Sequence, residues 1–398
     1  MLSRLATQPL LRHSFRVGLK PLRFQATLAK PITFSKHILV GSWQIGIAFL
    51  TAGAVAIGGI TRLTESGLSM TDWTPLTKAW PENQAAWDKE FANYKNSPEY
   101  EDLNQGMSLE EFKKIFFWEW FHRKWGNFIG ACYIIPYLGF LASGHLKRSN
   151  MVGRATGLGL VLGCQGLYGW YMVKSGLDRK NIENRLVEQA ATVSPYRLAG
   201  HLSLALTLFS GSLYNGLNLL IKPEGFRNTK IANFEELRLK AMKLKRMAPG
   251  MTFGVIALSI VSGAFVAGLN AGMIYNNYPH MADEGILPVD ILQHSPLWKN
   301  LLENPTTVQF EHRLLTHLAF ISVLVTFMVT KKCAPILPVR ANHAMNAVLG
   351  LTCLQVALGI TTILTQCHLH VAATHQINST ALLAGCIWFL HELKRLPK

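Results

Sequence analysis

Residues 116–141 read FFWEWFHRKWGNFIGACYIIPYLGFL, a nearly continuous apolar run with His122 close to its start. This run exceeds the roughly 20 residues that a helix needs to cross a bilayer. Seven other stretches are comparable, and the eight lie at about residues 39–60, 116–141, 155–173, 197–220, 250–270, 309–330, 344–364 and 372–391. They predict an all-α membrane protein with eight transmembrane helices, because lipid provides no hydrogen-bond partners for an open backbone.

The composition also favours a membrane protein. Charged residues make up 16% of the chain, whereas soluble proteins carry about 25%. The net charge of +16 lies in the N-terminal tail and in alternate loops, so it does not predict nucleic-acid binding. The six cysteines include no C-x-x-C motif, and we expect them to be buried thiols rather than a zinc site or a disulfide framework.

The distribution of basic residues predicts location and orientation. Residues 1–36 contain seven Lys or Arg and no Asp or Glu. This pattern favours a mitochondrial transit peptide over a basic disordered tail beside the membrane. Basic loops follow the second, fourth and sixth apolar stretches, so the positive-inside rule places them and both termini in the matrix. The segments 62–115 and 271–308 are then expected in the intermembrane space.

The two halves of the chain resemble each other, which predicts a duplication. Four motif pairs recur in the same order: Gly53, Ala54 and Gly58 with Gly263, Ala264 and Gly268; His122–Arg123 with His312–Arg313; Gln165 and Gly169 with Gln355 and Gly359; His201 and Gly211 with His375 and Gly385. Each unit has an even number of helices, so the repeats are expected to be parallel. We expect the helix 1 and helix 5 glycines to serve helix packing alone.

This duplication divides the chain into four parts. We predict a leader at residues 1–36, an N-terminal four-helix bundle at 37–221, a basic matrix linker at 222–249, and a C-terminal four-helix bundle at 250–398.

Four histidines, His122, His201, His312 and His375, fall in the first turns of the even-numbered predicted helices. A single histidine in a membrane helix more often has a hydrogen-bonded packing role than a ligand role. Recurrence of two histidines in each half favours pairs of imidazoles that hold a haem iron between facing helices. Zinc or a di-iron site fits less well, because these need more cysteine or carboxylate ligands. His368 and His370 compete with His375 on proximity, and the repeat alone selects His375.

Of two further positions beside the histidines, one differs between the halves and the other is the same in both. Glu119 lies three residues before His122, on the same helix face, and its counterpart Gln309 cannot exchange a proton. We therefore predict that the first half holds the reacting haem, with Glu119 as acid/base, and the second an accessory haem. A carboxylate that merely pairs with Arg123, Lys124 or water is an equally good interpretation. Arg123 and its counterpart Arg313 are predicted to bind haem propionates, with snorkelling to lipid head groups as the alternative.

At these residues the sequence resembles the mitochondrial haem A synthases, from about Gly41 to the C-terminus. The motifs are GGITRLTESGLSMTDW (58–73), FFWEWFHRKWGN (116–127), YRLAGH (196–201), FEHR (310–313) and THQ (374–376). The resemblance implies that a methyl group of haem O is oxidised to a formyl group by successive hydroxylations, giving haem A for cytochrome c oxidase. It also implies haem b on His312 and His375, and haem O on His122 and His201.

The resemblance further implies Glu119 as the catalytic acid/base and a matrix ferredoxin as electron donor. Some bacterial relatives carry a cysteine pair in the loop after helix 1, but residues 62–115 contain no cysteine. The expected partners also include membrane lipid and a homo-oligomeric assembly, and exclude nucleic acid.

Two other classes of protein remain as alternatives. A di-haem electron-transfer protein of the membrane cytochrome b type would also use two histidine pairs. The difference between Glu119 and Gln309 counts against it, because electron relay needs no proton group. A transporter ranks third, because its site is expected near the bilayer centre beside broken helices.

Overall fold

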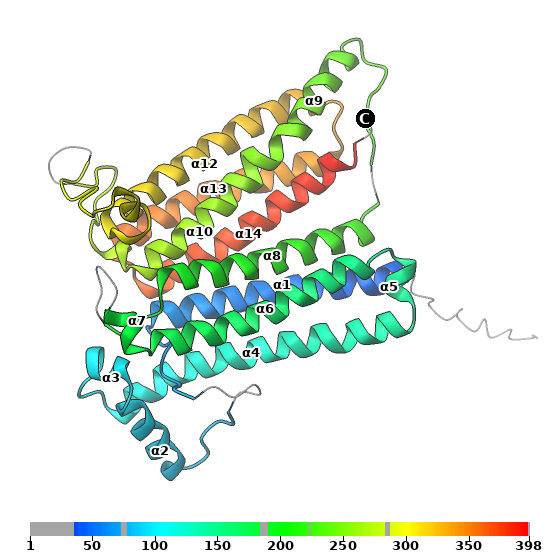
Figure 1. The fold of residues 1–398 in the computed structure, drawn as a ribbon. Helices are drawn as coiled ribbons and strands as arrows, with labels where there is room; N and C mark the ends of the chain where they lie inside the picture. The colour runs from blue at the N-terminus through cyan, green and yellow to red at the C-terminus, as the bar shows by residue number, and fades with distance from the viewer. Residues whose placement is uncertain (1–35, 73–77, 184–189, 223, 283–286, 397–398) are drawn as a thin grey trace, which may run out of the picture. The chain divides into compact units, whose positions relative to one another are not determined.

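The computed structural model describes residues 36–72, 78–183, 190–222, 224–282 and 287–396, and regular structure within these ranges is entirely helical. This confirms the all-α prediction, and each predicted apolar stretch lies on a long helix (Figure 1). The long helices are α1 (Lys36–Leu63), α4 (Leu109–Ala142), α6 (Val152–Gly176), α8 (Pro195–Leu220), α10 (Val255–Gly268), α12 (Pro305–Cys333), α13 (Val339–Leu364) and α14 (Leu369–Lys394).

Shorter helices occupy the connections: α2 (Gln84–Lys95), α3 (Pro98–Leu103), α5 (His145–Arg148), α7 (Arg179–Glu183), α11 (Asn300–Glu303), and the 3₁₀-helices η2 (Ala271–Met273) and η3 (Leu297–Lys299). Helix α9 (Phe234–Ala248) and the π-helix η1 (Pro249–Gly254) lead directly into α10, so the three form one helical segment, Phe234–Gly268. Within the described ranges, five helical segments are long and apolar enough to cross a bilayer: His37–Leu63, Leu109–Ala142, Phe234–Gly268, Pro305–Cys333 and Val339–Leu364.

The long helices pack in two sets. In the first, α1 and α6 each contact α4 and α8, and in the second, α10 and α13 contact α12, while α14 packs along α13. The two sets meet where α1 contacts α14 and where α8 contacts α10 and α14, and Figure 1 shows α8 beside the second set. Among the described residues, α4 and α8 are not closely packed on each other, nor are α12 and α14. The helices that carry the four histidines therefore lie diagonally within their sets.

A close approach between α1 and α14 joins the two sets. A Cβ built on Gly59 would lie 1.8 Å from Gln376 Oε1, so only glycine leaves room for this side chain. Gln376 Nε2 donates to the main-chain oxygen of Val55 at 2.9 Å. Nearby, Arg62 Nη2 donates to Asn270 Oδ1 at 2.9 Å. The side chain next to the ligand candidate His375 is therefore anchored on the first set.

Helix α4 begins earlier than its apolar stretch suggests. Ser108 and Glu111 form a capping box, in which Glu111 N donates to Ser108 Oγ and Ser108 N donates to Glu111 Oε2. His122 consequently lies 13 residues after Leu109, not in the first turns as predicted. The extra turns project into an aromatic cluster with α2, whose buried members are Met70, Trp87, Phe91, Tyr94, Phe112 and Phe116. This cluster fixes the segment after α1 against α4.

The predicted linker 222–249 contains a packed helix. Helix α9 buries Leu237, Ala241 and Leu244 on one face, contacts α12, and continues through η1 into α10. Arg238 and Lys240 lie on its outer side. The predicted leader lies outside the described residues except for its last position.

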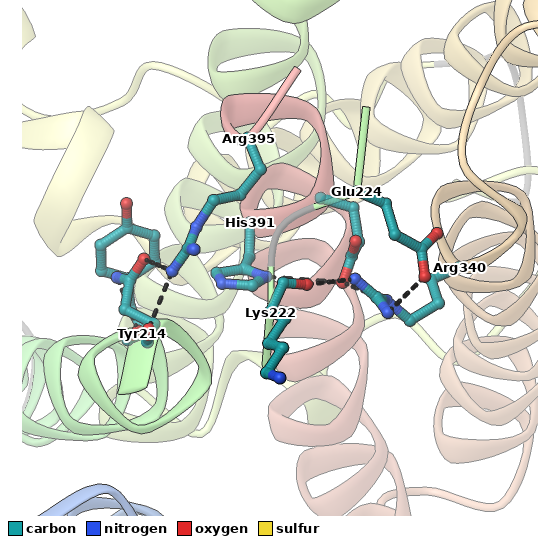
Figure 2. Close-up of polar contacts among 8 residues, drawn as sticks. Tyr214, Lys222, Glu224, Arg340, His391 and Arg395 are labelled. Carbon is teal, nitrogen blue, oxygen red and sulfur yellow. Dashed lines mark hydrogen bonds and ion pairs between the residues drawn. The ribbon is translucent and has the colours of Figure 1, made fainter. Parts of the chain in front are cut away.

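Polar side chains link the helices at the end of the molecule away from His122, His201, His312 and His375 (Figure 2). Arg340 donates to Glu224 at 2.5 Å and to Glu392 at 3.2 Å, so it joins α13 to α14 and to the segment after α8. Arg395 donates to both the main-chain oxygen and the side-chain oxygen of Asn218, each at 2.9 Å. These contacts fix the ends of α8, α13 and α14 relative to one another.

Candidate functional site

His122 on α4 and His201 on α8 face each other across the first set of helices. Their ring centroids are 6.5 Å apart. Each imidazole lies against a glycine of a flanking helix, because a Cβ on Gly58 would be 2.9 Å from His122 Cε1, and one on Gly169 would be 3.2 Å from His201 Cε1. The structure thus brings together the two predicted ligands of the first half.

In the second set, His312 on α12 and His375 on α14 also lie against glycines of flanking helices. A Cβ on Gly263 would be 3.3 Å from His312 Cε1, and one on Gly359 would be 3.0 Å from His375 Cε1. All four predicted histidines are therefore seated in the same way.

The sequence analysis assigned the glycines of helices 1 and 5 to helix packing alone, and this was incomplete. Gly58 and Gly263 each provide the space for an imidazole. They are not counterparts in the sequence alignment, where Gly53 matches Gly263. In the structure, Gly53 instead faces Trp125, because a Cβ on Gly53 would be 3.0 Å from the Trp125 ring.

The donor set and the geometry of the first pair fit a haem iron. Two metal–nitrogen bonds of about 2 Å each, plus the distance from each nitrogen to its ring centre, give roughly 6 Å between ring centres. The 6.5 Å separation of His122 and His201 is close to this value. The Nδ1 atoms of both rings are buried without a hydrogen-bond partner among the described residues, so protein contacts do not hold these imidazoles in another role. Bundle cores commonly hold a cofactor between facing helices, as these diagonal helices would.

Glu119 is buried one turn before His122 and is held by three hydrogen-bonding groups, one from each of three residues. Its Oε2 accepts from Ser69 Oγ and from Met70 N, both at 2.7 Å. Its Oε1 accepts from Arg123 Nη2 at 2.5 Å, and Arg123 also donates to the main-chain oxygens of Met70 and Asp72. The pairing of Glu119 with Arg123, which was the alternative to an acid/base role, is present, and the carboxylate lies one helical turn from His122. Sequence reasoning missed Ser69 and Met70, although both lie in the quoted motif at residues 58–73.

Gln309 occupies the matching place in the second half, but it donates hydrogen bonds to its loop, whereas Glu119 accepts hydrogen bonds from its loop. Its Nε2 donates to the main-chain oxygens of Ala271 at 2.8 Å and Tyr275 at 3.1 Å. Arg313 donates to Gln309 Oε1 at 3.2 Å and to the main-chain oxygens of Tyr275 and Asn277. The Nε of Arg313 is buried and has no partner among the described residues. Both arginines thus bind loop carbonyls, and Arg313 retains one N–H for another acceptor.

Other histidines lie apart from the two pairs. His317 bonds Tyr278 and the main-chain oxygen of Arg313, and His368 and His370 lie beside each other at the start of α14. His391, which the sequence analysis did not consider, is buried next to Glu392 at the opposite end of the helix (Figure 2). Sixteen residues separate it from His375, or about 24 Å along a helix.

Comparisons with known proteins show the family to which the chain belongs. Residues 41–387 match the model of the COX15-CtaA family, described as cytochrome oxidase assembly protein. The human protein named Heme A synthase COX15 is 41% identical over 375 residues, which cover 94% of this chain and 87% of that protein. A Schizosaccharomyces pombe protein named Heme A synthase-mitochondrial ferredoxin fusion protein is 35% identical, over 89% of this chain and 60% of its own length. The bacterial Heme A synthase of Parvibaculum lavamentivorans is 35% identical, over 91% of this chain and 96% of its own. The chain therefore belongs to the COX15-CtaA family of cytochrome oxidase assembly proteins.

Proposed function

We propose that the protein is a haem A synthase that oxidises a methyl group of haem O to the formyl group of haem A. It is an oxidoreductase, as the haem A synthases are. The observation that carries the proposal is a pair of facing imidazoles in the first half with a buried carboxylate beside it, together with a second histidine pair on the corresponding helices with an amide beside it. Haem bound to such ligands supplies one-electron and oxygen chemistry.

The two sites have different roles in this proposal. His122 and His201 bind haem O as the substrate, and His312 and His375 hold haem b. Gly58 and Gly263 leave space for the imidazoles to turn toward the bundle interior. Arg313 binds a haem propionate through its unpartnered Nε, and Arg123, which already bonds Glu119, orients the first loop over the substrate.

Glu119 moves protons in the first site. Hydroxylation of a methyl group by dioxygen takes up electrons and protons, places one oxygen atom in the new hydroxyl group and releases the other as water, so it needs a group that gains and loses a proton. The carboxylate oxygens of Glu119 can do this, and Arg123, Ser69 and Met70 N hold them in position. Gln309 fixes its loop equally well but carries no exchangeable acid proton, so the second half holds its haem without altering it.

The surroundings of the site complete the proposal. The eight long helices cross the mitochondrial inner membrane as two parallel four-helix repeats, with both termini in the matrix. A ferredoxin supplies electrons, which is supported by the fusion of a haem A synthase with a mitochondrial ferredoxin in Schizosaccharomyces pombe. An electron-transfer protein of the cytochrome b type is the alternative function, and it would leave haem O unchanged.

Extraction and chromatography of haems from the purified full-length protein test this function. We expect haem b together with haem O or A-type products. His312→Ala and His375→Ala should deplete haem b, whereas His122→Ala and His201→Ala should deplete haem O and its products. His343→Ala, an exposed residue of α13, is the control and should change neither. Recovery of haem b alone from both sites would refute the proposal in favour of the electron-transfer alternative.

A further inference from the structure

The two histidine pairs differ in what holds their rings, and the inference drawn from this difference rests on the proposed function. In the second half, His312 Nδ1 lies 2.7 Å from Ser262 Oγ. The Ser262 hydroxyl donates to the main-chain oxygen of Ser259 at 2.8 Å. Because a hydroxyl has one hydrogen, Ser262 must accept from His312 Nδ1–H. This fixes the tautomer and leaves the Nε2 lone pair for a metal.

A second chain of contacts holds His375. Gln355 Nε2 donates to the main-chain oxygen of His375 at 3.1 Å and lies 3.2 Å and 3.3 Å from the two ring nitrogens. Gln355 is itself oriented by Asn378, whose Nδ2 donates to Gln355 Oε1 at 2.6 Å and to the main-chain oxygen of Leu351 at 3.0 Å. Asn378 is buried, so these bonds are shielded from competition with water.

The first half retains only part of this scaffold. Gln165 is the counterpart of Gln355, but its Oε1 is buried without a partner among the described residues. Asn378 lies three residues after His375, and the residue three after His201 is Leu204, which has no donor to offer. This difference explains why Gln165 Oε1 lacks a donor among the described residues.

The serine is also missing from the first half. Ser262 immediately precedes Gly263, the glycine beside His312. Ala52 precedes the aligned glycine, and Ile57 precedes Gly58, the glycine that contacts His122. Neither carries a hydroxyl. The Nδ1 atoms of both first-half histidines accordingly have no partner in the described part of the chain.

We infer that Ser262, Gln355 and Asn378 are positioning residues that keep the haem of the second half permanently bound. Loss of a hydrogen-bond partner behind a metal-ligating histidine typically lowers metal affinity 10- to 100-fold. In the first half the same contacts are missing, so the haem there can leave. A substrate site has to release its product on every turnover, and tight equal binding of substrate and product slows release. The duplicated bundle thus separates a retained haem from an exchanging one.

Exchanging the residues between halves tests this. The readout is the rate at which haem passes from the purified full-length protein to excess apomyoglobin, with each haem identified by chromatography. Asn378→Leu should speed haem b release about 10-fold or more, and Leu204→Asn should slow release of haem O or A-type products by a similar factor. Ser203→Ala is the control, because its hydroxyl bonds only its own helix at Ala199 and should change neither rate.

Ser262 offers a spectroscopic test that general destabilisation would not reproduce. A hydrogen bond from Nδ1–H makes the imidazole a stronger donor and favours ferric iron. Ser262→Ala should therefore raise the midpoint potential of haem b and alter its low-spin electron paramagnetic resonance signal, and Ser262→Thr should restore both. The inference is wrong if wild-type protein holds haem b but Asn378→Leu and Ser262→Ala change neither release nor potential, and the proposed function then stands. Absence of haem b from wild-type protein would overturn both.

Discussion

Glu119→Gln tests the chemistry of the first site most directly, because it removes the exchangeable proton and hardly changes the volume of the side chain. The carboxylate accepts three hydrogen bonds, from Ser69, Met70 N and Arg123. A glutamine keeps one oxygen and replaces the other with an NH₂ group, which is a donor. Whichever way the amide turns, it presents hydrogens either to Arg123 or to Met70 N–H.

The structural cost of this change can be set against its chemical cost. One buried donor loses its acceptor, which costs about 1–3 kcal/mol. Loss of a positioned acid/base group lowers a rate by about 100- to 10,000-fold. We therefore expect Glu119→Gln protein to fold and bind both haems, to unfold at a somewhat lower temperature, and to produce haem A at no more than about 1% of the normal rate.

The matching change in the second half separates the loss of stability from the loss of reaction rate. Gln309→Glu places a carboxylate against the main-chain oxygens of Ala271 and Tyr275, which now accept from the amide. It should destabilise its loop by a comparable amount and leave Glu119 intact. The assay is the ratio of haem A to haem O in extracts of each variant, alongside thermal unfolding in detergent. Undiminished haem A formation in Glu119→Gln would refute the proton-transfer role.

Two further predictions concern stability. Gly59→Ala should lower the unfolding temperature, because the added Cβ would lie 1.8 Å from Gln376 Oε1 and would force Gln376 away from α1. Gly46→Ala is the control and should not lower it, because Gly46 has open space around it. Burial raises the pKa of Glu99 from 4.5 to about 8. Between these two pH values the folded protein keeps a proton that the unfolded chain loses. The stability of the α2–α3 region should therefore fall as the pH rises from about 4.5 to 8. Hydrogen exchange of this region across that pH range measures the effect; Glu99→Gln should flatten the profile, and an unchanged profile would contradict the assignment.

Sequence patterns predicted the parts of this protein that depend on local composition and on repetition. Apolar runs located the helices, and duplication selected His375 over two histidines nearer the helix start. Contacts between segments far apart in the chain were not predictable in the same way. The seating of His122 on Gly58, rather than on the aligned Gly53, depends on how α1 and α4 are rotated against each other. The bonds from Ser69 to Glu119 depend equally on how the segment after α1 returns to α4.

In the proposed function, the loops, rather than the residue at the Glu119 and Gln309 position alone, determine which half reacts. In each half this side chain lies four residues before an arginine that it contacts. The first loop presents an N–H and an O–H to this position, and only an acceptor satisfies both. The second loop presents two carbonyl oxygens, and only a donor satisfies them. A carboxylate at position 309 would therefore be buried against acceptors. To move the proton-exchanging carboxylate to the second half, the loop of the first half would have to be moved with it. Duplicated helices can thus keep the same haem ligands while their loops give the two copies different chemistry.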